Sequence, residues 1–249
     1  MKKVLISVCF CIIMLLGMSV VTVSASSGSA SLKGFDVDGW TYYDDTYENA
    51  IAVYDSSDRF YGTIDMWSAM YYIYDYQEDV MYYAILVETV TNANTTITFW
   101  QSYSTYNMDL GITIDGDYVN IVNYIPQQTS GSYNLSVSIA TDSIGFTLDE
   151  EYDEIELFVN EYSSGDCVAF NYIFTRYRDN INASPYKGTY KQKTVVLLEV
   201  EDYSQVWYQT ELDVLIGYNG SFFRDGFWDN QFLGDSLFET FTLEPFGVL

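Results

Sequence analysis

Residues 110–121 read LGITIDGDYVNI, in which apolar and polar residues alternate on either side of Asp115-Gly116. An Asp-Gly pair between two alternating runs is a strong signal for a two-residue hairpin turn. Pairing around this turn places Ile112 opposite Val119, so that the apolar residues of both runs share one face. The stretch therefore predicts an antiparallel hairpin with one face in a hydrophobic core.

The same alternation predicts two more hairpins further along the chain. One sets Leu135, Val137 and Ile139 opposite Leu148, Phe146 and Ile144, and the other sets Ile155, Leu157 and Val159 opposite Tyr172, Phe170 and Val168. From about Gly34 onward the pattern has a period of two almost throughout, and no long apolar stripe has the period of a helix. About a dozen strands at short spacing predict an all-β fold, an antiparallel and jelly-roll-like β-sandwich, in one domain over residues 34–249.

The composition excludes several classes of protein. Hydrophobic residues make up 49% of the 249 positions and charged residues 18%, which is far too apolar for a disordered chain. The formal net charge of −25 repels the phosphate backbone of nucleic acids, so we expect no nucleic-acid partner. The sequence contains no histidine, which excludes serine–histidine triads, cysteine–histidine pairs and histidine metal sites.

The first 25 residues predict export. A basic start at Lys2 precedes an apolar run and then small residues up to Ala25, which is typical of a cleaved secretory signal. Residues 26–33 are small and polar, and we expect them to form a mobile leader. Cys167 is the one cysteine beyond the signal, so no disulfide can form within the mature chain. These features predict a freely secreted, extracellular bacterial protein that does not insert into membranes once the signal is removed.

The hairpin predicted over residues 69–90 concentrates aromatic residues. With a turn near Gln77-Glu78, one face carries Met70, Tyr72, Tyr74, Tyr76, Met81, Tyr83, Ile85 and Val87. The opposite face is apolar or amphipathic too. Either the hairpin is central and covered on both faces, or one face is an open platform whose rings pack on the apolar faces of sugars. On the second interpretation, the ligand-binding residues are Tyr72, Tyr74, Tyr76 and Tyr83.

Three tryptophans extend the platform hypothesis. Trp100 is expected on the solvent-facing side of its strand, whereas its neighbour Phe99 is expected on the core side. Trp207 is expected on the same polar face as Gln209. Trp228 falls in a loop-like stretch of aromatic residues, carboxylates and one arginine. A large indole that faces water is uncommon unless a ligand covers it. Trp100, Trp207 and Trp228 are therefore further candidates for ligand binding.

The acidic residues suggest two kinds of site. Calcium takes several oxygen ligands, and the candidate metal ligands are Asp36, Asp38, Asp225 and Asp229, or the acidic residues of the stretch from Asp149 to Glu154. Calcium is the one candidate cofactor, although no stretch matches the helix-loop-helix calcium signature. Glu154 and Glu156 lie two residues apart on one predicted strand and share a face, which suits the carboxylate pair of a glycoside hydrolase.

These features favour a secreted, non-catalytic bacterial protein that recognises an extracellular glycan or a wall polysaccharide through an aromatic sheet surface. Two alternatives stay open. One is a glycoside hydrolase with a carboxylate pair, and the other is a factor that binds a host or cell-surface protein. The expected partner is accordingly an extracellular glycan or another cell-surface ligand.

Overall fold

The computed structural model describes residues 40–45, 49–96, 101–115, 119–126, 130–139, 142–151, 155–161, 167–174, 189–201, 212–226 and 231–243. Within these ranges the chain forms thirteen strands, which pair into antiparallel sheets and confirm the predicted all-β sandwich. None of the described residues belongs to a helix that is long and apolar enough to span a membrane. The signal, the leader and the single domain over residues 34–249 stay predictions.

The first large sheet contains six strands. They are β1 (Thr41–Asp45), β2 (Asn49–Tyr54), β3 (Phe60–Asp75), β4 (Val80–Ala93), β6 (Val119–Ile125) and β11 (Thr189–Val200). Their order is β1-β3-β4-β11-β6, and β2 also pairs with β3. β1 and β2 therefore pair with different parts of one long strand.

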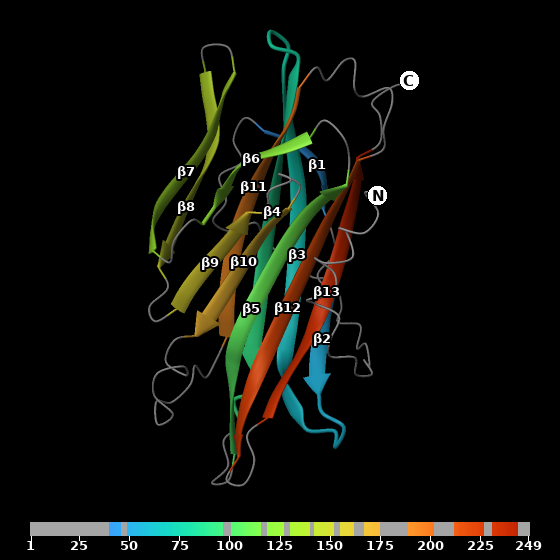
Figure 1. Cartoon of the computed structure of the whole chain (residues 1–249), viewed down its shortest axis with the longest axis vertical. Helices are drawn as coiled ribbons and strands as arrows, with labels where there is room; N and C mark the ends of the chain where they lie inside the picture. The colour runs from blue at the N-terminus through green and yellow to red at the C-terminus, as the bar shows by residue number, and fades with distance from the viewer. Residues whose placement is uncertain are drawn as a thin grey trace.

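The second large sheet contains five strands in the order β13-β12-β5-β10-β9. They are β5 (Gln101–Asp115), β9 (Ile155–Glu161), β10 (Cys167–Phe174), β12 (Leu212–Gly226) and β13 (Gln231–Leu243). β7 (Ser130–Ile139) and β8 (Asp142–Glu151) form a separate two-stranded sheet (Figure 1).

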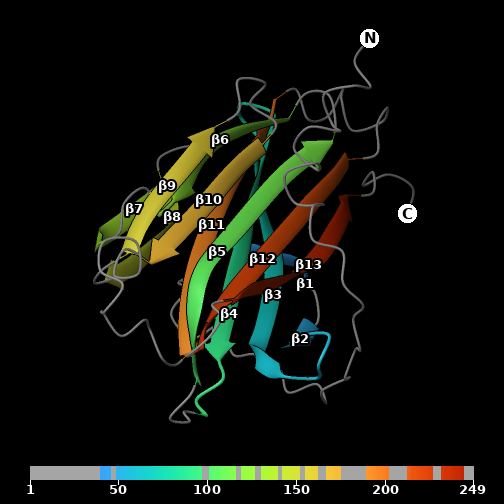
Figure 2. The ribbon, with the colours of Figure 1, turned by 60° about the horizontal axis from the view of Figure 1, so that its bottom comes forward.

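The two large sheets pack face to face around one hydrophobic core (Figure 2). β3 and β4 contribute Ile64, Met66 and Tyr83, which are completely buried. The second sheet contributes completely buried side chains from three strands, among them Met108, Phe170 and Ile216. Alternate residues of each strand supply this core, as the period of two requires.

The hairpin predicted around Asp115-Gly116 is wrong. β5 ends at Asp115 and β6 begins at Val119, but β5 pairs with β10 and β12, whereas β6 pairs with β11 in the other sheet. Ile112 accordingly lies opposite Val168 rather than Val119. The alternating pattern still predicts burial correctly. Apolar residues on the facing surfaces of two packed sheets are buried, just as they would be if they shared one face of a single sheet.

The next two predicted hairpins are confirmed, but their register differs from the predicted one by two residues. Leu135 lies opposite Phe146 instead of Leu148, and β9 and β10 show the same shift. Because successive residues alternate between faces, a shift of two leaves every residue on its predicted face. Alternation therefore predicts the face of a residue better than its partner.

The long β3–β4 hairpin is confirmed in both turn and register. Tyr72 lies opposite Tyr83, as pairing around Gln77-Glu78 requires. The Asp75 carboxylate accepts hydrogen bonds from the backbone N–H groups of Gln77 (2.8 Å) and Glu78 (3.4 Å). This acceptor satisfies two backbone donors that the turn would otherwise leave to water.

Candidate functional site

Both faces of the β3–β4 hairpin are packed against other parts of the protein. On the face toward the second sheet, Met70 and Tyr83 are completely buried. On the opposite face, Tyr71 is 5% exposed and Leu86 is completely buried, and both belong to an apolar cluster with Trp40. The hairpin is therefore central and covered on both faces, which was the first of the two interpretations.

The four tyrosines proposed as ligand-binding residues differ in exposure. Tyr83 is completely buried, Tyr72 and Tyr74 are half-buried, and Tyr76 at the turn is 86% exposed. The rings of Tyr74 and Tyr76 meet edge to face, with 4.5 Å between their centroids. The Tyr74 hydroxyl donates to Asp79, and this hydrogen bond raises the pKa of the phenol to about 12. These tyrosines therefore do not form one open, continuous row.

Most of the other predicted site residues lie outside the described part of the chain. They are Asp36, Asp38, Trp100, Glu154, Trp207, Trp228 and Asp229. Glu156 lies on β9 and Asp225 on β12, where the structure describes the backbone alone. Among the described side chains, no group of three or more Asp, Glu or Cys gathers as the ligands of a metal would. The described residues do not test these assignments, and calcium stays a prediction.

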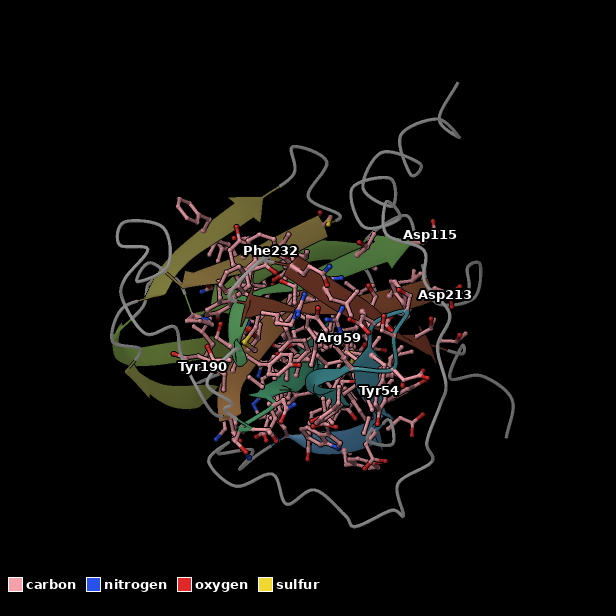
Figure 3. All side chains as sticks on the ribbon, turned by 90° about the horizontal axis from the view of Figure 1, so that it is seen from below. Tyr54, Arg59, Asp115, Tyr190, Asp213 and Phe232 are labelled. Carbon is pink, nitrogen blue, oxygen red and sulfur yellow. The ribbon has the colours of Figure 1, made fainter. Side chains whose placement is uncertain are left out.

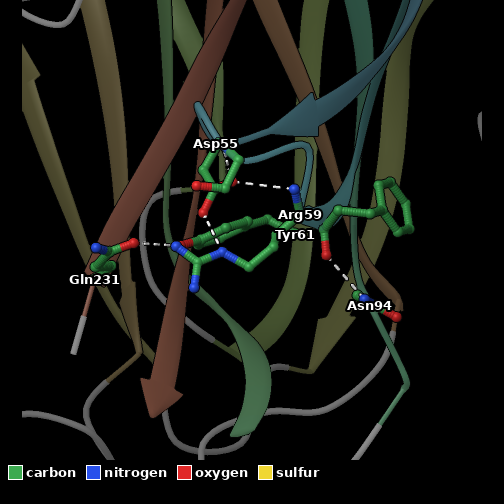
Figure 4. Close-up of polar contacts among 7 residues, drawn as sticks. Asp55, Arg59, Tyr61, Asn94 and Gln231 are labelled. Carbon is green, nitrogen blue, oxygen red and sulfur yellow. Dashed lines mark hydrogen bonds and ion pairs between the residues drawn. The ribbon is translucent and has the colours of Figure 1, made fainter. Parts of the chain in front are cut away.

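A cluster of polar side chains lies at the end of the sandwich where the chain passes from β2 to β3 (Figures 3 and 4). Asp55 accepts hydrogen bonds from the backbone N–H groups of Ser57 (2.8 Å) and Arg59 (3.0 Å), and pairs with Arg59 Nε at 2.6 Å. Desolvation acts to raise the pKa of Asp55, but these hydrogen bonds and the guanidinium lower it. The Tyr61 hydroxyl donates to Gln231 Oε1 at 3.0 Å and so joins β3 to β13 of the other sheet. The cluster has a structural role.

The second sheet carries a half-buried carboxyl group on the face that points away from the core. Asp109 on β5 accepts hydrogen bonds from Asn107 Nδ2 at 2.9 Å and from Asn171 Nδ2 on the neighbouring strand β10. Desolvation raises the pKa of Asp109 to about 6, although both amide hydrogen bonds act to lower it. The carboxyl group therefore changes its charge within the range of pH in which proteins commonly work.

Ionisation of Asp109 should cost stability. The unfolded chain loses this proton near pH 4 and the folded chain near pH 6, so the free energy of unfolding falls as pH rises through that window. The free energy of unfolding of Asp109→Asn, minus that of the unchanged protein, should increase by about 1 kcal/mol as the pH rises from 5 to 7.5. Urea unfolding of both proteins measures this gain, with the exposed Asp115→Asn as the control. A gain of equal size in both variants would contradict the assignment.

β7 and β8 lie beside the sandwich and form a hairpin of their own (Figure 1). Within the described part of the chain, these strands pair with each other and with no strand of either large sheet. A two-stranded hairpin alone is at best marginally stable in water. The two large sheets can therefore keep all of their strand pairs if this hairpin moves to another environment.

The two faces of the β7–β8 hairpin differ in chemistry, as the register and strand alternation show. One face collects the apolar pairs Tyr133–Leu148, Leu135–Phe146 and Val137–Ile144. The other face collects the small polar pairs Asn134–Thr147, Ser136–Gly145 and Ser138–Ser143. Neither strand contains Lys or Arg, and the acidic residues stand at the two ends of β8.

Strand length and, away from the two ends, residue alternation are features that this hairpin shares with strands of membrane barrels. A β-strand needs about 9 to 11 residues to cross a bilayer, and β7 and β8 have 10 residues each. In membrane barrels, apolar residues that face lipid alternate with polar residues that face the lumen. The surface of a soluble domain is instead rich in charged residues, and the middle of this polar face has none.

Comparison with solved structures finds similar chains, among them two toxins and a pore forming protein. The fold matches the Clostridium perfringens delta-toxin with a TM-score of 0.52 at 11% identity, over 79% of this chain and 88% of that one. A chain described as a pore forming protein matches with a TM-score of 0.50 at 11% identity, over 82% and 95% of the two chains. The membrane-inserted form of the Clostridium perfringens NetB toxin matches with a TM-score of 0.46 at 9% identity, over 82% and 93%. No protein-family model matches the chain, and no curated protein matches its sequence.

At these identities, the first two matches show the class of fold, a β-sandwich shared with the delta-toxin and with the pore forming protein. They correct the hypothesis drawn from the aromatic residues. A platform for an extracellular glycan on the β3–β4 hairpin needs one open face, and both faces are packed. The interpretation as a non-catalytic glycan-binding protein is therefore wrong. The matches support neither of its alternatives, the glycoside hydrolase and the protein-binding factor.

The alternating pattern predicted the β7–β8 hairpin, but as a part of the sandwich and without a function of its own. Its alternation is equally typical of a strand pair with one wet face. The signal that distinguishes the two cases is the polar face, which along the middle of both strands consists of Ser, Asn, Thr and Gly and carries no charge.

Proposed function

We propose that this chain is a secreted pore-forming protein, in which the β7–β8 hairpins of several copies form a membrane-spanning β-barrel. The observation that carries the proposal is a hairpin outside both large sheets. Along its middle, over residues 133–138 and 143–148, one face is apolar and the other is polar and uncharged. The likeness in fold to the delta-toxin and to the pore forming protein supports it.

Several copies are needed because one hairpin cannot satisfy its backbone in lipid. An unpaired N–H or C=O group in the hydrocarbon layer costs several kcal/mol, and a lone hairpin has two open edges. Hairpins of adjacent copies that pair edge to edge close into a barrel without edges. The apolar face around Val137 then meets lipid, and the polar face around Ser136 meets water in the lumen.

The sandwich is the part that stays folded in this proposal. Removing the hairpin from its place breaks no strand pair of either large sheet. The core between these sheets and the cluster of Asp55, Arg59, Tyr61 and Gln231 lie outside the hairpin as well. Each copy can therefore insert two strands without unfolding its larger part.

Secretion is consistent with the proposal, because the predicted signal over residues 1–25 would bring the chain to the outside, where it could meet a target membrane. The proposal departs from the expectation that the mature chain does not insert into membranes. A long apolar stretch is typical of a helix that crosses a bilayer. A β-strand that crosses a bilayer has alternating apolar and polar residues instead. A cell-surface ligand and the absence of a nucleic-acid partner stay predictions.

Release of a trapped dye from lipid vesicles tests the proposal. The mature chain, residues 26–249, is added to phosphatidylcholine vesicles that hold a self-quenching dye, with heat-denatured protein as the control. We expect dye release that rises more steeply than linearly with protein concentration, because several copies must assemble. Vesicles that keep their dye at every protein concentration would contradict the proposal.

A further inference from the structure

The charges in the middle of the chain all have one sign. Residues 60–175, which include the hairpin, contain no Lys or Arg. Within the hairpin, the acidic residues at the base are the last three of β8, namely Asp149, Glu150 and Glu151. Their register partners on β7 are Ser132, Gly131 and Ser130, so no cation stands opposite them on the hairpin.

Strand alternation divides these three acidic residues between the two faces. Asp149 and Glu151 belong to the polar face, with Ser132, Asn134 and Ser136. Glu150 belongs to the apolar face, with Leu148 and Phe146. The division follows from the pairing of the backbone and from the sequence alone.

From this division we infer that the pore passes cations in preference to anions, because Asp149 and Glu151 of every copy form a double ring of carboxylates at one mouth of the lumen. The inference rests on the proposed function. Rings of Asp or Glu make channels selective for cations, since they raise the local concentration of cations and repel anions. The rest of the polar face is uncharged and offers no opposing ring.

The position of the acidic residues at the base fits a barrel. A charged residue on the lipid side of a barrel destabilises it most at the bilayer midplane and little near the interfaces, and Asp or Glu destabilises it less than Lys or Arg does. Glu150 is therefore tolerated on the lipid side if the base of the hairpin lies at the membrane surface. The same depth places Asp149 at the entrance of the lumen, where a passing ion is still partly hydrated.

Single-channel recording in planar phosphatidylcholine bilayers tests the inference. The mature chain is added to one side, and the reversal potential is measured in a tenfold gradient of potassium chloride. We expect a potassium-to-chloride permeability ratio of about five or more, which Asp149→Asn lowers at least about twofold. Glu150→Gln is the matched control, because it removes the same charge from the neighbouring residue on the other face, and it should leave the ratio unchanged.

The outcomes separate the selectivity from the pore itself. Channels with a permeability ratio at or below one would overturn the selectivity and leave the proposed function standing. An equal loss of selectivity in Asp149→Asn and Glu150→Gln would overturn the assignment of the carboxylates to the two faces. Bilayers that show no channels at any protein concentration would overturn the proposed function, and the selectivity with it.

Discussion

Leu135→Lys should reduce dye release at least about tenfold, because it puts a charge on the face of the hairpin that meets lipid in the proposed barrel. Leu135 pairs with Phe146 in the middle of the apolar row. A lysine near the bilayer midplane of a barrel costs about 2–4 kcal/mol, and every copy in the ring bears this cost. The change lies outside both large sheets, so the sandwich should keep its cooperative unfolding.

Ser136→Lys is the matched control for this result. It adds the same charge to the neighbouring residue, which belongs to the polar face with Gly145. In the proposed barrel this lysine meets water in the lumen, so release should stay within about twofold of the unchanged protein. Equal loss of release in both variants, or loss in Ser136→Lys alone, would show that the faces are assigned wrongly.

Replacing residues 130–151 by a flexible linker should abolish dye release and leave the sandwich folded. The hairpin pairs with neither large sheet, so its loss removes no strand pair from them. A glycine–serine linker of about eight residues is flexible and can join the remaining ends of the chain. We expect the shortened protein to unfold in one cooperative transition within a few degrees of the full mature chain.

Thermal unfolding followed by circular dichroism and the same vesicle assay check both halves of this prediction. A shortened protein that still releases dye would show that another part of the chain forms the pore. A shortened protein that has lost its cooperative transition would show that the hairpin supports the core. Dye release by the full mature chain in parallel is the positive control.

Alternation in the sequence predicted which residues face the core, but it could not predict which strands lie side by side. Leu110 and Ile112 are buried as expected, yet their strand pairs with β12, about a hundred residues further along the chain. A period of two depends on burial, and many pairings bury the same residues. Turn signals add a local preference only, which the Asp115-Gly116 stretch shows, because there the chain passes from one large sheet to the other.

The candidate site could be predicted in part. Alternation placed the apolar residues of the hairpin, such as Leu135 and Val137, on one face, and the register shift of two leaves them there. The independence of the hairpin from both sheets was not visible, because it depends on where the neighbouring strands find partners. The interpretation of the tyrosines as an open platform was wrong for a related reason, because Tyr83 is buried in the core between the two large sheets.

Measuring the environment of each residue of β7 in the presence of membranes tests most directly whether the β7–β8 hairpin forms a barrel. Single cysteines are introduced at positions 133 to 138 in a Cys167→Ser background and labelled with a polarity-sensitive fluorophore. With lipid vesicles, we expect emission that alternates with a period of two, blue-shifted at positions 133, 135 and 137 and water-like at positions 134, 136 and 138. Emission that stays water-like at all six positions, or shifts equally at all of them, would contradict a β7–β8 barrel.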